Sequence, residues 1–468
     1  METSIEGDLS LKQGNLSEII YNNRYIILAI VLTGTLMSVM NSNIVNIALP
    51  SITSYFNVGV AQSQWIVSVY FLTITAMFLI FGKISEYTGK TKLFISGFVL
   101  FTVSSLACGL SASLDQLILF RIFQAFGASM IFSISTAIIM DVFPDGEKGR
   151  ALGYQASVVA IGMIIAPALG GFIVDWLGWE YIFFVNIPLG IVGLVSALKY
   201  LKIEEHKSKR LNMDWIGSSM FILLMVALIL FMGELSDVGS KMIVIYGFIL
   251  LLSLLIFILR ELNCEEPLLD LSLFKVNRFI KPAIGLILFF VASNMINIVY
   301  PFYFVDVLKW NATEVGLTLG IMAVMLLLVS PVSGWIYDRY KFRNLSSLGA
   351  LITGLTILVF AYMLLIGNIT CSMVSMAVIG AACALFMVPN NTDVMTSLPR
   401  KTNVLSSVTA TFRNFGVFLG VSLATTLVSL VSSSYLGVSG QSIGNIMIDI
   451  FFGIGGIYIV AAIVVYKR

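Results

Sequence analysis

Long apolar runs separated by short polar or Gly/Pro-containing turns constrain this chain most. A helix that crosses a bilayer needs roughly 20 predominantly apolar residues. Only 11% of the 468 residues are charged, against about 25% in soluble domains. We therefore predict an all-α integral membrane protein with 14 transmembrane helices. The predicted spans are residues 25–48, 64–82, 93–112, 117–140, 151–174, 181–200, 215–233, 242–260, 280–305, 314–337, 345–366, 371–391, 404–431 and 443–465.

The composition also narrows the function classes. The residues outside the spans leave room only for short loops and tails, so no separate water-soluble domain is expected. A net charge of +2 offers no basic surface for nucleic acid. The four cysteines are widely spaced, which predicts neither a disulfide framework nor a metal site. The sequence has no P-loop, paired-histidine or nucleophile-elbow pattern, so we expect no enzyme, no cofactor and no direct use of ATP.

The positive residues predict the orientation, because Lys and Arg are retained on the cytoplasmic side of a membrane. With the N-terminus inside, 23 of the 27 basic residues fall in the tails, in the inward loops or at the inner ends of spans. We therefore expect a multi-pass protein of the plasma membrane with both termini cytoplasmic. The predicted organisation is a cytoplasmic tail (1–24), a six-helix bundle (25–200), cytoplasmic loops with the inserted seventh and eighth helices (201–279), and a second six-helix bundle (280–468).

Two inward turns repeat one pattern. The turn 82–92 follows the second helix and the turn 334–343 follows the tenth. In each, a glycine precedes an acid, Glu86 or Asp338, by four residues, and basic residues follow. A single copy could be a solvated loop whose cations fix the topology. Two matched copies indicate a duplicated chain, and parallel repeats are typical of rocking-bundle carriers with the substrate site between the halves.

At these residues the sequence resembles the major facilitator superfamily, whose loop between the second and third helices is similar to residues 82–92. Glu86 stands where that family usually has aspartate, and Tyr87 where it usually has arginine. The resemblance implies that the two acids lock an inner gate through charge pairs with helix ends. The gating residues implied are Gly82, Glu86, Gly89, Lys90, Asp338 and Arg339.

The fourth helix carries Arg121 one turn from its start, and Gln124 lies on the same helix face. Charges within a bilayer tend to mark transport pathways, and in the resembling family this pair faces the central cavity. The alternative is that Arg121 extends to the outer interface.

The fifth helix contains a run of small residues and a proline: Gly153, Gly162, Pro167, Gly170 and Gly171. Small residues permit close helix approach, and proline bends a helix. The run resembles the antiporter signature of the superfamily and favours an exporter. Generic helix packing is the alternative.

The first helix, residues 40–50, resembles the first-helix motif of the fourteen-helix drug:proton antiporters, with Asn41 where aspartate is usual. An amide cannot exchange a proton near neutral pH as a partly buried carboxylate can. We therefore take Asp393 as the best substitute proton carrier, with an ordinary carboxylate at the inner interface as the alternative.

The central cavity is expected to be positive, because Arg121 and Arg413 have no first-helix carboxylate to balance them. Neutral or anionic substrates then become plausible. The cavity candidates are Asn41, Asn43, Asn294 and Asn297 as hydrogen-bonding groups, and Trp65, Tyr70 and Tyr300 as aromatic walls. Each of them could equally be an interhelical contact or an interface residue.

The sequence thus predicts a secondary active exporter of amphipathic small molecules that works by alternating access, with proton antiport, and functions as a monomer among membrane lipids. The alternative is a uniporter or other carrier, not coupled to protons, for anionic or neutral amphiphiles or lipids. A membrane enzyme or sensor that has lost transport is a third possibility, disfavoured because catalytic patterns are missing.

Overall fold

The computed structural model describes residues 21–58, 60–63, 65–203, 214–234, 241–264, 267–269, 271–310, 312–342, 344–367, 370–398, 402–434 and 440–466. In these residues all regular structure is helical. The first-half helices are α2 (Arg24–Tyr55), α3 (Val60–Ser63), α4 (Trp65–Thr88), α5 (Lys90–Gly109), α6 (Leu114–Val142), α7 (Lys148–Trp176), α8 (Tyr181–Phe184) and α9 (Asn186–Tyr200). They are followed by α10 (Trp215–Glu234), α11 (Met242–Asn263), η1 (Leu271–Lys275), α12 (Asn277–Phe302), η2 (Tyr303–Val307), α13 (Ala312–Tyr340), α14 (Leu345–Leu365), α15 (Thr370–Thr396), α16 (Thr402–Ser434) and α17 (Gly440–Val465).

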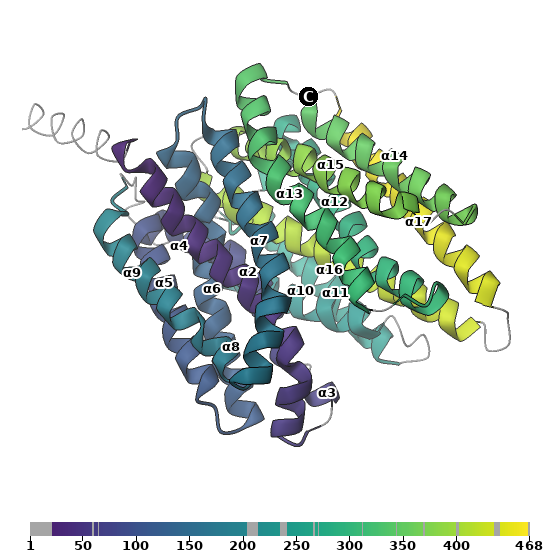
Figure 1. The fold of residues 1–468 in the computed structure, drawn as a ribbon. Helices are drawn as coiled ribbons and strands as arrows, with labels where there is room; N and C mark the ends of the chain where they lie inside the picture. The colour runs from purple at the N-terminus through teal and green to yellow at the C-terminus, as the bar shows by residue number, and fades with distance from the viewer. Residues whose placement is uncertain are drawn as a thin grey trace, which may run out of the picture.

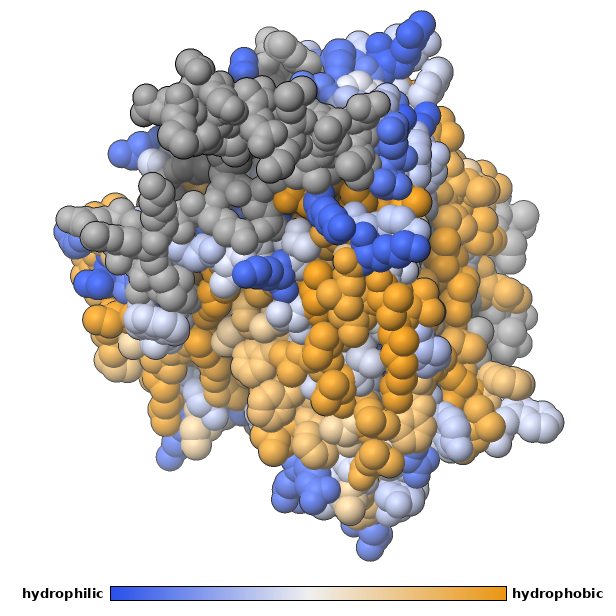
Figure 2. Space-filling model, turned by 90° about the vertical axis from the view of Figure 1, so that its left-hand side faces the viewer, coloured by the Kyte–Doolittle hydropathy of each residue, from blue (hydrophilic) through white to orange (hydrophobic). Residues whose placement is uncertain are grey.

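The helices suit a membrane by length and composition. Among the described residues, 13 helices are long and apolar enough to cross a bilayer, and the apolar part of α10, Trp215–Leu228, is shorter. Figure 2 shows a broad apolar band on one face of the molecule, with hydrophilic residues above and below it. The prediction of an all-α membrane fold is therefore confirmed.

Two bundles repeat one packing order (Figure 1). In the first, α2 packs on α7, α4 on α6, and α5 on α6 and α9. In the second, α12 packs on α16, α13 on α15, and α14 on α15 and α17. The order of partners is the same in both bundles, as a duplicated chain requires.

The two bundles join at one end, where α2 begins and α17 ends. There the largest buried apolar cluster brings Leu405 and Val408 of α16 together with Phe81 of α4 and Ile139 of α6. We call this end the closed end; the sequence predicts that it is cytoplasmic. The other two described clusters each stay within one bundle, except that Ala160 of α7 packs with the second. In Figure 1 the bundles meet near α7 and α13 and splay apart toward the opposite end.

The pair α10–α11 lies beside the seam, which is the region of contact between the two bundles. α10 packs on α11, on α4 and, less extensively, on α16. Asp214 caps α10 at the closed end: it accepts the Gly217 N–H at 3.0 Å, and Arg260 of α11 donates to it at 3.1 Å. Burial opposes the ionised form of Asp214, but these donors outweigh it and hold the pKa of its carboxyl below the usual value.

One predicted span is interrupted. Residues 181–200 form two helices, α8 and α9, which meet at Val185. Pro188 cannot donate a hydrogen bond to the Phe184 carbonyl, which weakens the helix there. The side chain of Asn186 instead donates to the Ile182 carbonyl at 3.3 Å, so the break places an amide inside the first bundle.

Candidate functional site

Asp338, in the last turn of α13, joins the second bundle to the first. It is 9% exposed, and its carboxylate accepts the backbone N–H groups of Gly149 and Arg150 at 3.0 and 2.9 Å. These groups lie in the first turn of α7, where N–H groups have no intrahelical partner and the helix dipole favours a carboxylate. A Cβ on Gly334 would lie 2.1 Å from the Gly149 carbonyl oxygen, so glycine permits this approach.

The repeated turns share their backbone conformation. Gly89 and Lys341, at matching positions of the two copies, both adopt positive φ angles, 92° and 49°. Each donates its N–H to the residue four positions earlier, Ser85 or Tyr337, at 3.0 and 2.9 Å. The duplication therefore extends from the sequence pattern to the shape of the turn.

The acids of the two turns make different contacts. Glu86 pairs with Lys83 of its own helix at 3.0 Å, whereas Trp335 occupies the position of Lys83 in the other copy. Among the described residues, Glu86 therefore pairs with a lysine of its own helix α4, whereas Asp338 caps the start of α7 in the other bundle.

On the side of the seam where α4 lies, Lys90 links the two bundles. It donates to Asp141 of α6 and, at 3.2 Å, to Thr402 of α16. Gly82 provides the close approach, because a Cβ there would lie 2.3 Å from the Ser407 Cβ. The two sides of the closed end thus use one pattern with different donors and acceptors.

A polar cleft of about 290 Å³ lies over the seam at the closed end. Arg339 is exposed there, and Lys341 donates to the Asp145 carbonyl at 3.4 Å. The hydrogen bond from Lys148 lowers the pKa of the Asp145 carboxyl. The cleft is lined by Gly146, Glu147, Arg150, Trp335, Asp338 and Arg339.

The glycines of α7 divide between two neighbours. A Cβ on Gly153 would lie 2.5 Å from the Ser330 carbonyl of α13, while Gly162 and Gly170 face Val39 and Ile44 of α2. Gly171 has open space around it. Pro167 lies within α7, and its side chain is outside the described residues.

Arg121 lies inside the first bundle, with 0% exposure. It donates to Gln124 Oε1 at 2.7 Å and to the Ile66 carbonyl at 3.1 Å, and its Cζ lies 3.9 Å from the Tyr70 ring centroid. The cation is therefore held by an amide, a carbonyl and an aromatic face. Because it is enclosed, it does not extend to the outer interface.

Gln124 connects Arg121 to two other helices. It donates to Asn41 of α2 at 3.3 Å and to Ser105 of α5 at 2.7 Å. Asn186 of α9 also donates to Asn41, at 3.4 Å. The network thus unites α2, α4, α5, α6 and α9. Sequence reasoning missed both Ser105 and Asn186 as partners in this network.

The remaining predicted residues are distributed between surface and interior. Trp65 is 49% exposed and Tyr300 is buried, stacked on Phe304 at 4.1 Å. Arg413 of α16 lies across the seam over Phe132 of α6, with 4.4 Å from Cζ to the ring centroid.

Three polar candidates lie in or beside the second bundle. Asn294 is half-buried and donates to the Phe290 carbonyl at 2.9 Å, and Asn297 is exposed. Asp393 accepts a hydrogen bond from the Tyr337 hydroxyl of α13. The described contacts do not bring these three residues to the Arg121 network.

Residues 31–421 match the family described as the Major Facilitator Superfamily. The chain belongs to this superfamily. It is therefore a multi-pass membrane protein of a family of transporters, and a secondary transporter rather than an enzyme. The repeated turns and the paired bundles described above belong to this superfamily's fold.

Superfamily relatives cover most of the chain. The riboflavin transporter RibZ of Clostridioides difficile (strain 630) is 30% identical over 399 residues, which are 85% of this chain and 86% of that protein. The multidrug export protein EmrB of Escherichia coli (strain K12) is 26% identical over 398 residues, 84% of this chain and 78% of that protein. The solved human organic anion transporter MFSD10 has a TM-score of 0.65 at 12% identity and covers 94% of this chain and 99% of its own, which shows the shared fold.

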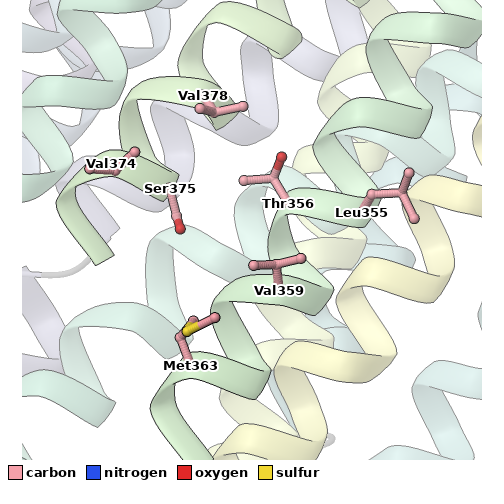
Figure 3. Close-up of a pocket in the computed structure, with 7 residues that line it drawn as sticks. All are labelled: Leu355, Thr356, Val359, Met363, Val374, Ser375 and Val378. Atoms are coloured by element: carbon pink, nitrogen blue, oxygen red, sulfur yellow. The ribbon is translucent and has the colours of Figure 1, made fainter. Parts of the chain in front are cut away.

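A second cleft, of about 360 Å³, lies between α14 and α15 within the second superfamily bundle (Figure 3). Thr356 and Ser375 are its polar residues, and its other lining residues, Leu355, Val359, Met363, Val374 and Val378, are apolar. This lining suits an acyl chain better than a charged substrate, and the cleft holds none of the predicted site residues.

Proposed function

We propose that this protein is a secondary carrier that exports amphipathic small molecules by alternating access, in the fourteen-helix drug:proton antiporter branch. The proposal rests on one observation, which is that the contacts between the two bundles gather at the closed end. Contacts such as Asp338 with Gly149 and Lys90 with Thr402 join the bundles at the closed end, while the apolar clusters beyond stay within one bundle apart from Ala160. Two repeats joined in this way present a central site to one side of a membrane.

The proposed orientation follows from the basic residues. With the closed end in the cytoplasm of a plasma membrane and both termini inside, the structure corresponds to the carrier facing outward. Both bundles come from one chain, which supports function as a monomer. We therefore assign substrate release to this state and loading to the state in which the closed end has opened.

The charges favour neutral or anionic amphiphiles over lipophilic cations. Among the described residues, no carboxylate forms an ion pair with Arg121 or Arg413. A cationic substrate would therefore be repelled by buried positive charge that no described acid balances. One relative is named for riboflavin, a neutral and flat aromatic molecule. This supports a flat aromatic substrate with hydrogen-bonding groups, and riboflavin is the first compound to test.

Proton antiport is the proposed coupling, with Asp393 as the carrier of the proton. The Tyr337 hydroxyl donates to this carboxylate and can follow a change in its protonation by reorienting. Asn41 favours the alternative, a uniporter of neutral or anionic amphiphiles, because its amide cannot titrate in place of an acid.

Flux measurements in proteoliposomes test both parts of the proposal. Riboflavin, the anion 2-naphthoate and the cation ethidium are compared, with a pH gradient and a voltage imposed separately. We expect riboflavin or naphthoate flux above that of empty liposomes, acceleration by the pH gradient, and loss of that acceleration in Asp393→Asn. Asp449→Asn, which alters an exposed acid of α17, is the control. Flux that ignores the pH gradient would favour the uniporter, and export of ethidium alone would overturn the substrate assignment.

A further inference from the structure

We propose that the interior of the first bundle contains a binding site for a small monovalent anion, formed by Arg121, Asn41 and Tyr70. This site is separate from the transported amphiphile of the proposed function. The starting observation is a group of buried donors: Arg121 Nη2 has no hydrogen-bond partner, and Asn41 Nδ2 and the Tyr70 hydroxyl have only their contact with each other and, for Tyr70, with Ser42. All three residues are 0% exposed, and buried polar groups normally have partners.

The three donors belong to one cluster. The Arg121 guanidinium lies over the Tyr70 ring, with Cζ 3.9 Å from the ring centroid. Gln124 bridges Arg121 and Asn41, at 2.7 and 3.3 Å. The Tyr70 hydroxyl lies beside Asn41. The three residues therefore lie together where α2, α4 and α6 meet.

The charge of the cluster is also unbalanced. The acceptors that hold Arg121 are the Gln124 amide oxygen and the Ile66 carbonyl, both of which are neutral. Among the described residues, no carboxylate pairs with this guanidinium. A buried charge is costly unless an opposite charge accompanies it. Asn41 could have supplied that charge as an aspartate, but its amide cannot.

An anion satisfies both requirements. A buried water accepts hydrogen bonds from such donors but brings no charge. Chloride accepts several hydrogen bonds and carries the missing negative charge. A carboxylate group on a small molecule has the same chemistry, so the test must separate an inorganic anion from an organic one.

Thermal unfolding of the full-length protein in detergent tests the site. Chloride is titrated against gluconate at constant ionic strength, since gluconate is too bulky for an enclosed site. A ligand that binds only the folded state raises the unfolding midpoint in a saturable way, here by about 2 to 4 °C. Asn41→Asp provides its own carboxylate and should lose the chloride response. Asn46→Asp is the control, because Asn46 is exposed on the same helix; its response should match the wild type.

Two further measurements complete the test. Bromide soaked into crystals of the wild-type protein should give an anomalous peak beside Arg121. This measurement does not depend on whether a variant folds. If formate raises the midpoint and chloride does not, the anion is a small organic carboxylate. The proposal is overturned if neither anion raises the midpoint, or if Asn41→Asp responds to chloride as the wild type does. Riboflavin flux through the wild-type protein, measured separately, reports on the proposed transport function.

Discussion

At the residue scale, one buried guanidinium organises the first bundle. Arg121 is held by Gln124, by the Ile66 carbonyl and by the face of Tyr70. The spacing of Arg121 and Gln124 on one helix face could be predicted from sequence. Their partner Ser105 could not, because one small polar residue in an apolar helix forms no pattern, and only packing places α5 beside α6.

The first prediction concerns Arg121→Ala. A hydrogen bond to a charged group contributes about 1.5 to 3 kcal/mol, so losing the bond to the Ile66 carbonyl together with the contact with Tyr70 should misplace α4 against α6. We expect riboflavin flux to fall at least about tenfold, while the protein still elutes as a folded species in size-exclusion chromatography. Full flux in this variant would mean that Arg121 has no part in transport.

A second prediction compares the two repeated acids. Asp338→Ala removes the carboxylate that caps α7 across the seam, which should cost about 1 to 2 kcal/mol in the closed end. Opening of that end should rise about 5- to 30-fold, measured as the distance between spin labels on Lys92 and Tyr340, both exposed. Glu86→Ala breaks a pair within α4 and should have a smaller effect. Equal effects would contradict the asymmetry.

At the element scale, α7 serves two neighbours along its length. Its first turns pack on α13 of the other bundle, and its later turns pack on α2 of its own. The helix is therefore part of the seam at one end and part of the first bundle at the other. Small residues permit both contacts, since glycine lets backbones approach closely.

The third prediction uses two adjacent glycines of this helix. Gly170→Leu would overlap Ile44, which lies 2.8 Å from the position of a Cβ, and overpacking costs about 1 to 3 kcal/mol. Gly171→Leu meets open space and should be neutral or gain up to about 0.8 kcal/mol in helix propensity. The thermal unfolding midpoint should fall only in Gly170→Leu. A similar loss in both variants would mean that chain stiffness and not packing is responsible.

A fourth prediction concerns the cap of α10. Asp214→Ala should cost about 1 kcal/mol and release the base of the α10–α11 pair. Because the folded pKa of Asp214 lies below its usual value, its stabilisation is present above the unfolded pKa of about 3.9 and is lost as the pH falls through the folded pKa. The stability gap between wild type and variant should shrink as the pH falls below about 4. Asp214→Asn, which keeps a capping oxygen, should lose less stability than Asp214→Ala. A stability gap that grows in acid would contradict a lowered pKa of Asp214.

At the scale of the whole molecule, the helices were predictable and their assembly was less so. Apolar runs located each span, but several helices extend beyond the runs, to Tyr55 in α2 and to Thr88 in α4, seven and six residues further than predicted. The split at Val185 and the enclosure of Arg121 depend on contacts between segments far apart in sequence. For the same reason, the paired turns at Glu86 and Asp338 look alike in sequence but bind different partners.

The fifth prediction tests the seam as a unit. Gly82→Leu would overlap Ser407 across the seam and should hold the closed end open, increasing the distance between labels on Lys92 and Tyr340. Gly146→Leu is the matched control, because a Cβ there meets nothing within 4 Å. An unchanged distance in Gly82→Leu would mean that the contact between Gly82 and Ser407 does not control the opening of the closed end.

The position of α10 and α11 has a mechanical consequence. α10 packs more extensively on α4 than on α16, and only 11% of the most apolar stretch of α11 is buried. The pair should therefore travel with the first bundle when the bundles rock and slide past α16. Each cycle then displaces lipid around α11. The free energy of switching between the two states should therefore depend on bilayer thickness and acyl-chain order. The rate of transport should then depend on the membrane as well as on the substrate.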